Sequence, residues 1–434
     1  MYNILKLNLK YIKNYIMQPL RGTKDILPND IILWQHLYSK ALEILSLSNY
    51  YEIRTPIFEP TSLFNRSIGN GTDIVNKEMY SFIDQGNRSI TLRPEGTASI
   101  IRSFISNKLY QERKTNRLWY LGPMFRYERP QHGRQRQFHQ LGIECIGSMS
   151  PMADTEVIRL ATHLLTELQC TEYRTEINSI GNLEERNLYK KSLVEYLLNY
   201  KQDLDHDSQE RLYTNPLRIL DSKHKTTQEI LHQAPTLNNY LGSESRIHFN
   251  SVCKYLNKLN IKYSINDKLV RGLDYYNYTT FEIKTNVLGS QDTICGGGRY
   301  DCLIKQLGGP DTPAVGWAIG IERLLLIIKN NLDIKKKNPK VYLATQGIEA
   351  QTKIWDIIKI LEKHQISFEL DLYNNNLQKQ IKRAYKSSAS ICLILGDDEI
   401  RKEGIILKWL NTKTQKTILN MNLGKELKAI FNTD

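Results

Sequence analysis

Four arginines surround a polar loop in residues 125–144, which read FRYERPQHGRQRQFHQLGIE. They are Arg126, Arg129, Arg134 and Arg136. A planar guanidinium can donate two parallel hydrogen bonds to phosphate oxygens, so this loop could bind a polyphosphate. A solvated basic hairpin would explain the same charges, and the rest of the sequence has to decide between the two interpretations.

The run that follows the loop alternates as a β-strand does. With a period of two, Phe138, Gln140 and Glu144 share one face, whereas Leu141 and Ile143 lie on the other. The second face is expected to pack in the core. The first face carries an amide and a carboxylate separated by a glycine, which leaves room for a small polar ligand between them.

A second polar group occurs where a strand is predicted to end and a helix to begin, in TLRPEGT at residues 91–97. Proline suits the first turn of a helix, and Glu95 and Thr97 could simply cap it. A glutamate at a helix start could equally bind a substrate ammonium group. The local pattern leaves both interpretations open.

Two further stretches combine glycines with arginines and tyrosines. LVRGLDYY contains Arg271, Tyr275 and Tyr276, and CGGGRYD contains Tyr300 beside three glycines. Tyrosines offer flat surfaces with hydroxyl tips, and glycines let a backbone approach a ligand closely. A tight bulge in a sheet would also explain the glycines, and Arg271 could pair with Asp274 merely to hold its loop.

The order of predicted elements divides the chain into five segments. Residues 17–170 alternate strand-like runs with helical stretches, which favours a mainly antiparallel sheet backed by helices, and residues 256–332 resume that pattern. Residues 171–255 are polar and mostly helical, as an insertion would be. After a basic linker, residues 333–434 alternate strand and helix, which is typical of a separate small α/β domain. Residues 1–16 are predicted to be a disordered extension.

Within the fourth segment, PAVGWAIGIERLLLIIK at residues 313–329 is expected to form one helix. Its glycines would pack closely against a neighbouring element. Arg323 lies near the middle of this apolar run. Because burying an unpaired guanidinium is costly, we expect Arg323 to have a partner.

Composition narrows the class of protein. The 434 residues carry a formal net charge of +13, which favours an encounter with a polyanion such as nucleic acid. The six cysteines contain no C-x-x-C pair, so neither a zinc site nor a disulfide framework is indicated, and a reducing compartment fits best. No apolar stretch approaches the ~18 residues that span a bilayer, so we expect a soluble protein without a membrane partner.

Several of these stretches together resemble a known family. TPIFEPTSLF, the loop of residues 125–144 and GWAIGIERLLL resemble motifs 1, 2 and 3 of class II aminoacyl-tRNA synthetases. TLRPEGT and LVRGLDYY resemble the two signatures of the histidyl-tRNA synthetase family. The resemblance runs from about Leu20 into the C-terminal segment, and it implies an α+β fold. That fold has a six-stranded antiparallel catalytic sheet flanked by helices, a helical insertion and a C-terminal α/β anticodon-binding domain.

The resemblance implies an activity and its partners. L-histidine and ATP would give histidyl-adenylate and diphosphate, and the histidyl group would then pass to tRNA-His with release of AMP. Magnesium would accompany the ATP, without an organic cofactor, and the spacing assigns no protein ligands to the metal. Motif 1 implies a homodimer, with Pro56 as the matching proline. Many Ile, Asn, Lys and Tyr residues indicate an AT-rich genome, so we expect a cytoplasmic protein or one of the plastid (chloroplast) stroma.

The resemblance also implies roles for residues that bind ATP. Arg126 would bind the α-phosphate, and Arg323 would hold the γ-phosphate. Phe138 would stack on adenine, and Glu128 would help to read it. Arg271 would stabilise the α-phosphate while the histidine carboxylate attacks, so Arg126 and Arg271 are the expected catalytic residues.

A larger set would bind histidine and tRNA. Glu95, Thr97 and Gln140 would hold the α-amino group, and Glu144 and Tyr276 would meet the imidazole. The acceptor end of tRNA would contact the loop arginines Arg134 and Arg136. The complete set expected to bind histidine is Glu95, Gly96, Thr97, Arg126, Gln140, Glu144, Arg271, Tyr275, Tyr276 and Tyr300.

Two alternatives come from catalytically silent relatives. The regulatory subunit of ATP phosphoribosyltransferase shares the catalytic-like fold and binds histidine as an effector, but it normally lacks an anticodon domain. A stress-sensing domain that binds uncharged tRNA would be expected to have degenerate motifs. Arg126, Arg271 and Arg323 are all present here, and this favours the enzyme.

Overall fold

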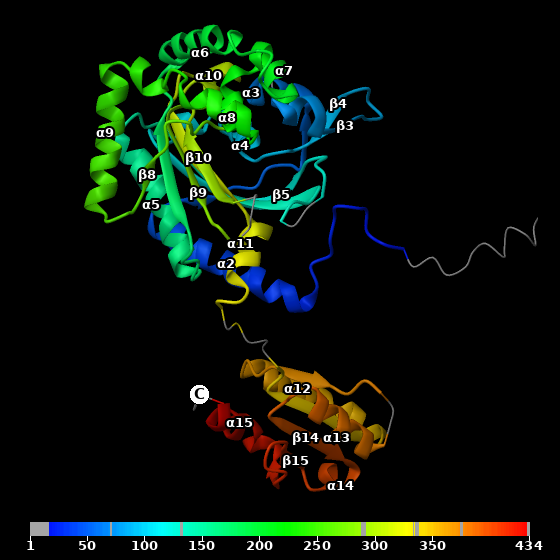
Figure 1. The fold of residues 1–434 in the computed structure, drawn as a ribbon. Helices are drawn as coiled ribbons and strands as arrows, with labels where there is room; N and C mark the ends of the chain where they lie inside the picture. The colour runs from blue at the N-terminus through cyan, green and yellow to red at the C-terminus, as the bar shows by residue number, and fades with distance from the viewer. Residues whose placement is uncertain are drawn as a thin grey trace, which may run out of the picture. The chain divides into compact units, whose positions relative to one another are not determined.

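The computed structural model describes residues 17–69, 72–130, 133–287, 292–332, 334, 338–373 and 376–431. The chain divides into two compact units, residues 1–334 and 335–434 (Figure 1). The prediction for residues 1–16 lies outside the described residues. Among the described residues, no helix is both long enough and apolar enough to cross a membrane.

An eight-stranded sheet organises the first unit. Its six central strands pair antiparallel throughout, as predicted, and a two-residue strand joins each edge in parallel. In order across the sheet the strands are β1 (Tyr51–Glu52), β5 (Asn116–Phe125), β6 (Gln137–Ile146), β11 (Ala314–Gly320), β10 (Thr293–Arg299), β9 (Asn277–Lys284), β7 (Arg174–Ser179) and β8 (Ser264–Ile265).

Long helices cover one face of this sheet, and the core between them includes the fully buried Trp119, Leu141 and Phe281. Helix α5 starts where the side chain of Ser150 accepts a hydrogen bond from the backbone N–H of Met152, with a proline in the first turn. The helices on this face are α2 (Pro28–Leu47), α5 (Pro151–Glu167), α9 (Ser243–Lys258) and α11 (Ile321–Ile328).

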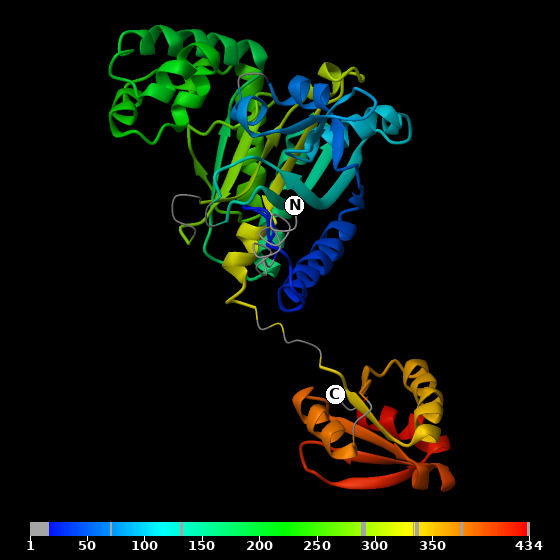
Figure 2. The same ribbon diagram turned by 90° about the vertical axis from the view of Figure 1, so that its right-hand side faces the viewer.

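The opposite face carries the polar side chains that concern function. A three-stranded sheet and short helices frame it: β2 (Phe58–Pro60), β3 (Tyr80–Ile83), β4 (Ser89–Leu92), α3 (Thr61–Ile68), α4 (Thr97–Ser106) and α10 (Leu303–Gln306). A helical segment follows β7 along the chain and gathers at the end of the unit remote from α2 (Figure 2). Its helices before α9 are α6 (Leu183–Leu198), α7 (His206–Thr214) and α8 (Lys225–His232).

One sequence-based expectation in this unit is wrong. Residues 314–320 form strand β11 between β6 and β10, and the helix predicted over residues 313–329 begins only at Ile321. The strand is buried on both faces, so its run of small and large apolar residues hides the period of two. Residues 171–255 are mostly helical, as expected, although the segment begins with strand β7, which pairs with β9, and its helices start only at Leu183.

The second unit is a mixed α/β domain, as strand–helix alternation predicted. Its sheet has the order β13-β12-β14-β15-β16. Strand β12 pairs in parallel with β13 and β14, whereas β15 pairs antiparallel with β14 and with β16. The strands are β12 (Val341–Gln346), β13 (Phe368–Leu370), β14 (Ile391–Gly396), β15 (Gly404–Trp409) and β16 (Gln415–Leu419). The helices are α12 (Ile348–Lys363), α13 (Leu377–Lys386), α14 (Asp397–Arg401) and α15 (Leu423–Phe431).

Candidate active site

A cavity of about 190 Å³ opens over the polar face of the large sheet. Strands β6, β10 and β11 contribute to its wall, together with the start of α4, the start of α11 and the loop before β9. Twelve residues predicted to bind histidine, ATP or tRNA line it: Glu95, Thr97, Arg126, Glu128, Arg134, Phe138, Gln140, Arg271, Tyr275, Tyr276, Tyr300 and Arg323.

Strand β6 presents its two faces as the alternation predicted. Leu141 and Ile143 are fully buried in the core beneath the sheet, while Phe138 and Gln140 line the cavity. The buried Oε1 of Gln140 has no hydrogen-bond partner among the described residues. Because an unpaired buried oxygen costs about 1–3 kcal/mol, this atom indicates a ligand that donates a hydrogen bond.

Glu144 lies behind the cavity wall, with 1% of its surface exposed. Its carboxyl group accepts hydrogen bonds from the hydroxyl of Tyr300 and, at 2.8 Å, from Thr97 Oγ1. Burial raises the pKa of Glu144 to about 8, even though both hydrogen bonds act in the opposite direction. Glu144 therefore reaches the cavity through two hydroxyl groups that themselves line it.

Glu95 caps a helix, as one interpretation of TLRPEGT predicted, and it also lines the cavity. Its carboxylate accepts hydrogen bonds of 2.7 Å from the backbone N–H groups of Thr97 and Ala98 at the start of α4. Gly96 does not line the cavity. A Cβ at Gly96 would come within 2.7 Å of the buried ring of Tyr120, so a larger residue there would displace that tyrosine.

Three tyrosines form an aromatic wall. The ring centroids of Tyr275 and Tyr276 are 4.6 Å apart, and those of Tyr275 and Tyr300 are 5.5 Å apart. The guanidinium of Arg271 lies over Tyr276, with its central carbon 5.8 Å from the ring centroid. The same guanidinium forms an ion pair with Glu282 of β9, so the predicted alternative in which Arg271 pairs with Asp274 is wrong.

The other arginines that line the cavity lie around the motif 2 loop and α11. Arg126 Nε donates to the carbonyl of Pro94 at 2.8 Å, and Arg134 Nε lies 3.0 Å from a carboxylate oxygen of Glu128. Arg323 donates to two backbone carbonyls, those of Gly133 and Thr293. Burial and then the positive charge of Arg134 lower the pKa of Arg323. This concentration of positive charge suits a polyphosphate.

Two of the four loop arginines, Arg129 and Arg136, do not line the cavity. Arg136 has other contacts. Its guanidinium is 3.9 Å from the ring centroid of Tyr127, and its backbone N–H donates to the carbonyl of Gly22. A cation that lies over an aromatic ring already has a favourable electrostatic contact with that ring. The sequence showed that four arginines flank the loop but could not show which of them turn inward.

Several residues of the site were missed by sequence reasoning. Trp317 and Ala318 of β11 line the cavity, and recognition of β11 as a strand would have indicated this wall. Glu322 also lines it, and its carboxylate accepts hydrogen bonds from the backbone N–H of His139 at 3.0 and 2.9 Å. The carboxylate of Glu282 lies beside Thr293 across paired strands, a contact that no local motif could reveal.

Comparison with known proteins identifies the family. The family model of histidyl-tRNA synthetase matches residues 22–324, and an anticodon-binding domain model matches residues 340–430. A chloroplastic histidine–tRNA ligase from Gracilaria tenuistipitata var. liui is 66% identical over 96% of this chain and 99% of its own length. A histidine–tRNA ligase from Cyanothece sp. is 53% identical over 94% of this chain and 95% of its own.

A solved structure agrees with these sequence matches. Apo histidyl-tRNA synthetase from S. aureus superposes with a TM-score of 0.80 at 35% identity, covering 95% of this chain and all of that one. The shared sequence and fold therefore place this chain in the histidyl-tRNA synthetase family.

Proposed function

We propose that this protein ligates L-histidine to tRNA-His through a histidyl-adenylate, as a histidine–tRNA ligase. The observation that carries the proposal is one cavity lined by the amide of Gln140, the carboxylate of Glu95 and the guanidinium groups of Arg126, Arg271 and Arg323. Such a cavity can place an amino acid carboxylate beside the phosphates of ATP, which is the geometry that adenylate formation requires.

The test is histidine-dependent exchange of pyrophosphate into ATP. We expect exchange with histidine and none with glutamine, since a pocket with buried polar groups rejects analogues that leave them unpaired by up to ~10⁴. A catalytically silent relative would bind histidine without exchange. Equal exchange with glutamine would contradict the assignment.

At the histidine end, we propose that Glu95, Thr97 and Gln140 bind the α-amino group. The unpartnered Oε1 of Gln140 and the carboxylate of Glu95 are acceptors, as an ammonium group requires. Glu144 and Tyr276 are assigned to the imidazole. The remaining contacts of this pocket are assigned to Tyr275 and Tyr300, and Gly96 is assigned a supporting role, because it leaves room for the ring of Tyr120.

At the ATP end, Arg126 and Arg271 are assigned to the α-phosphate and Arg323 to the γ-phosphate. The guanidinium of Arg126 also lies over Phe138, with 5.2 Å between its central carbon and the ring centroid, so a base could stack on this ring beside a bound phosphate. Glu128 is assigned to adenine. As the histidine carboxylate attacks, negative charge grows on the α-phosphate oxygens, and fixed guanidinium groups stabilise it.

Magnesium is proposed to arrive with ATP. The described residues contain no cluster of three or more His, Cys, Asp or Glu side chains that could hold a metal ion. Magnesium at nucleotide sites is commonly bound by one or two carboxylates and the phosphates themselves. Glu282 fits this role, because its Oε2 lies 3.3 Å from Thr293 Oγ1 and Thr293 lines the cavity. The ion would neutralise charge on the outer phosphates.

Transfer RNA is proposed to contact both units. Arg134 and Arg136 are assigned to the acceptor end, and residues 333–434 to the anticodon stem-loop. A chain that ends at Asn338 should still form adenylate, while tRNA charging becomes much less efficient. Raising the salt concentration should weaken tRNA binding steeply, as phosphate contacts demand. Unchanged charging by the truncated chain would remove the second unit from tRNA recognition.

A homodimer is proposed through motif 1. Around Pro56, the apolar side chains of Tyr51, Ile57 and Phe58 are exposed by 49%, 41% and 58%. Covering such a patch in a partner would remove apolar surface from water. Light scattering after size-exclusion chromatography should give twice the mass of the chain, and a monomeric mass at micromolar concentration would contradict this.

A plastid location is proposed from the names of relatives, since the 66% identical protein from Gracilaria is called chloroplastic. The many Ile, Asn, Lys and Tyr residues, whose codons are rich in A and T, agree with an organelle genome. Fractionation of the source cells, with an antibody to this chain, should place it in the stroma. Its recovery in the cytosol alone would contradict the proposal.

A further inference from the structure

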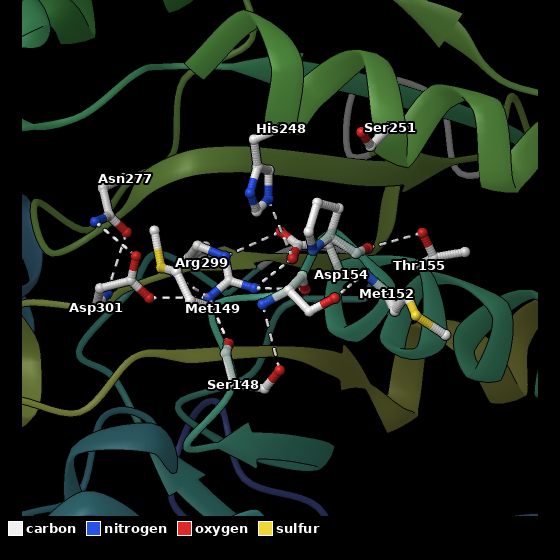
Figure 3. A network of polar contacts seen from close by, with 12 residues as sticks. Ser148, Met149, Met152, Asp154, Thr155, His248, Ser251, Asn277, Arg299 and Asp301 are labelled. Atoms are coloured by element: carbon white, nitrogen blue, oxygen red, sulfur yellow. Dashed lines mark hydrogen bonds and ion pairs between the residues drawn. The ribbon is translucent and has the colours of Figure 1, made fainter. Parts of the chain in front are cut away.

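A buried polar cluster lies beneath the histidine end of the cavity, on the side of the sheet that faces α5 and α9 (Figure 3). We call it the Arg299 network, and its side chains are Asp154, His248, Asn277, Arg299 and Asp301. Arg299 and Asp154 are both completely buried. The roles proposed above use none of these residues.

Arg299 uses all of its donor capacity within this network. Its Nε and one terminal nitrogen bind the carboxylate of Asp154, and the other terminal nitrogen lies 3.0 Å from Asp301 Oδ1. The carbonyls of Ser148 and Ser150 accept from the same two terminal nitrogens at 2.9 and 3.4 Å. Five N–H groups with five acceptors fix the guanidinium in one position.

The carboxylates extend the network to other elements. Asp301 Oδ1 also accepts from the backbone N–H of Ala314 at 3.1 Å, and Oδ2 accepts from Asn277 at 3.2 Å. Asp154 Oδ2 lies 3.3 Å from His248 Nε2 of α9. The network therefore connects α5, α9 and three neighbouring strands of the large sheet at one point.

Tyr300 is the residue between the two anchored positions. Because side chains alternate along an extended chain, Arg299 and Asp301 point away from the cavity while Tyr300 points into it. The backbone N–H of Tyr300 donates to the carbonyl of Ala314 at 2.8 Å, and its hydroxyl donates to Glu144. Residues 299 to 301 are thus held from behind at both ends of this tyrosine.

We infer that Asp154, Arg299 and Asp301 are positioning residues for histidine recognition, which act by fixing the hydroxyl of Tyr300 against Glu144. The inference rests on the proposed role of that pair at the histidine end. A displacement of even 1 Å in a binding group can cost up to ~10²-fold in efficiency. The buried network prevents such a displacement without touching the substrate.

The test compares two conservative substitutions in one helix. Asp154→Asn weakens the network, whereas Glu156→Gln breaks a different ion pair of α5, in which Arg117 Nε of β5 lies 3.1 Å from the carboxylate. For Asp154→Asn we expect the histidine KM in pyrophosphate exchange to rise about tenfold, with the ATP KM and kcat within about twofold. For Glu156→Gln we expect all three values to stay near those of the wild type.

A merely structural role would appear differently. Loss of folded protein lowers kcat and the melting temperature but leaves the histidine KM unchanged, and that result with Asp154→Asn would overturn the inference. If Asp154→Asn does not fold, Asp301→Asn provides the same comparison, since its amide oxygen can still accept from Ala314. An unchanged histidine KM in this second variant would overturn the inference as well.

Combination with Tyr300→Phe separates this inference from the proposed function. If the network acts through the hydroxyl, Asp154→Asn should raise the histidine KM by less than about twofold once that hydroxyl is absent, because coupled residues are not additive. A full tenfold rise in the Tyr300→Phe background would overturn the inference alone. No effect of Tyr300→Phe itself would instead remove Tyr300 from histidine binding, and no exchange by the wild type would reject the proposed function.

Discussion

At the histidine end of the cavity carboxyl and hydroxyl groups are bonded to one another, whereas at the arginine end guanidinium groups bind backbone carbonyls and the carboxylate of Glu128. Glu144, Thr97 and Tyr300 form a closed set of hydrogen bonds in a buried pocket. Arg126 and Arg323 donate to backbone carbonyls, and nitrogens of Arg126 and Arg134 lie 3.8 and 3.0 Å from the carboxylate of Glu128. The first arrangement suits recognition of one side chain, and the second gathers three guanidinium groups in one cavity wall, which suits phosphates.

Substitution of Arg271, which is assigned to the α-phosphate, should give the largest effect. Loss of one preorganised donor typically costs ~10² to 10³ in kcat, or about 3 to 4 kcal/mol. Arg271→Ala should slow adenylate formation by that order, as measured by pre-steady-state quench, while the histidine Kd without ATP changes much less. Glu282 would be left without its ion-pair partner, so the melting temperature has to be measured in parallel. Near-normal adenylate formation by a stable variant would contradict the role of Arg271.

Glu144→Ala should weaken histidine binding selectively. The substitution leaves the hydroxyls of Thr97 and Tyr300 without their acceptor, and each unpaired buried group costs about 1–3 kcal/mol. The histidine KM in exchange should therefore rise by at least about tenfold, with a smaller change in the ATP KM. Gln140→Ala is the matched comparison on the same face of β6. An unaffected histidine KM in Glu144→Ala would contradict the assignment of Glu144 to the imidazole.

The raised pKa of Glu144 predicts an effect on stability that depends on pH. Its folded pKa of about 8 exceeds the ordinary value of 4.5, so between these values the folded protein keeps a proton that the unfolded chain releases. Stability should fall as pH rises through this range, by at most about 1.4 kcal/mol per pH unit. Urea unfolding from pH 5 to 8.5 should show that the free energy of unfolding of Glu144→Gln increases relative to that of the wild type as pH rises. A constant difference would mean that the pKa of Glu144 is not raised.

The sequence predicted more of the residues at the histidine end than of the residues that hold them in place. The period of two in residues 137–146 and the polar start of α4 correctly predicted the local structure, because each depends on neighbours in the chain. Strand β11 was predicted as helix, since a strand buried on both faces shows no alternation. The Arg271–Glu282 pair joins a loop to a strand, and motif spacing cannot reveal such a contact.

The same limit applies to the Arg299 network. Asp154 and Arg299 are 145 residues apart in the chain and meet only because α5 packs beneath β10. CGGGRYD drew attention to its glycines and its tyrosine, while its arginine and aspartate serve the opposite side of the sheet. A sequence motif can therefore contain binding and supporting residues in alternation, and the sheet separates them.

Calorimetric titration of histidine and of ATP into three proteins tests most directly whether the two ends of the cavity bind different ligands. The proteins are the wild type, Glu144→Gln and Arg323→Gln. The account predicts that Glu144→Gln loses about tenfold or more in histidine affinity with little change for ATP, and that Arg323→Gln does the reverse. If either substitution weakens both ligands equally in a folded protein, the two ends do not act separately, and the central claim is wrong.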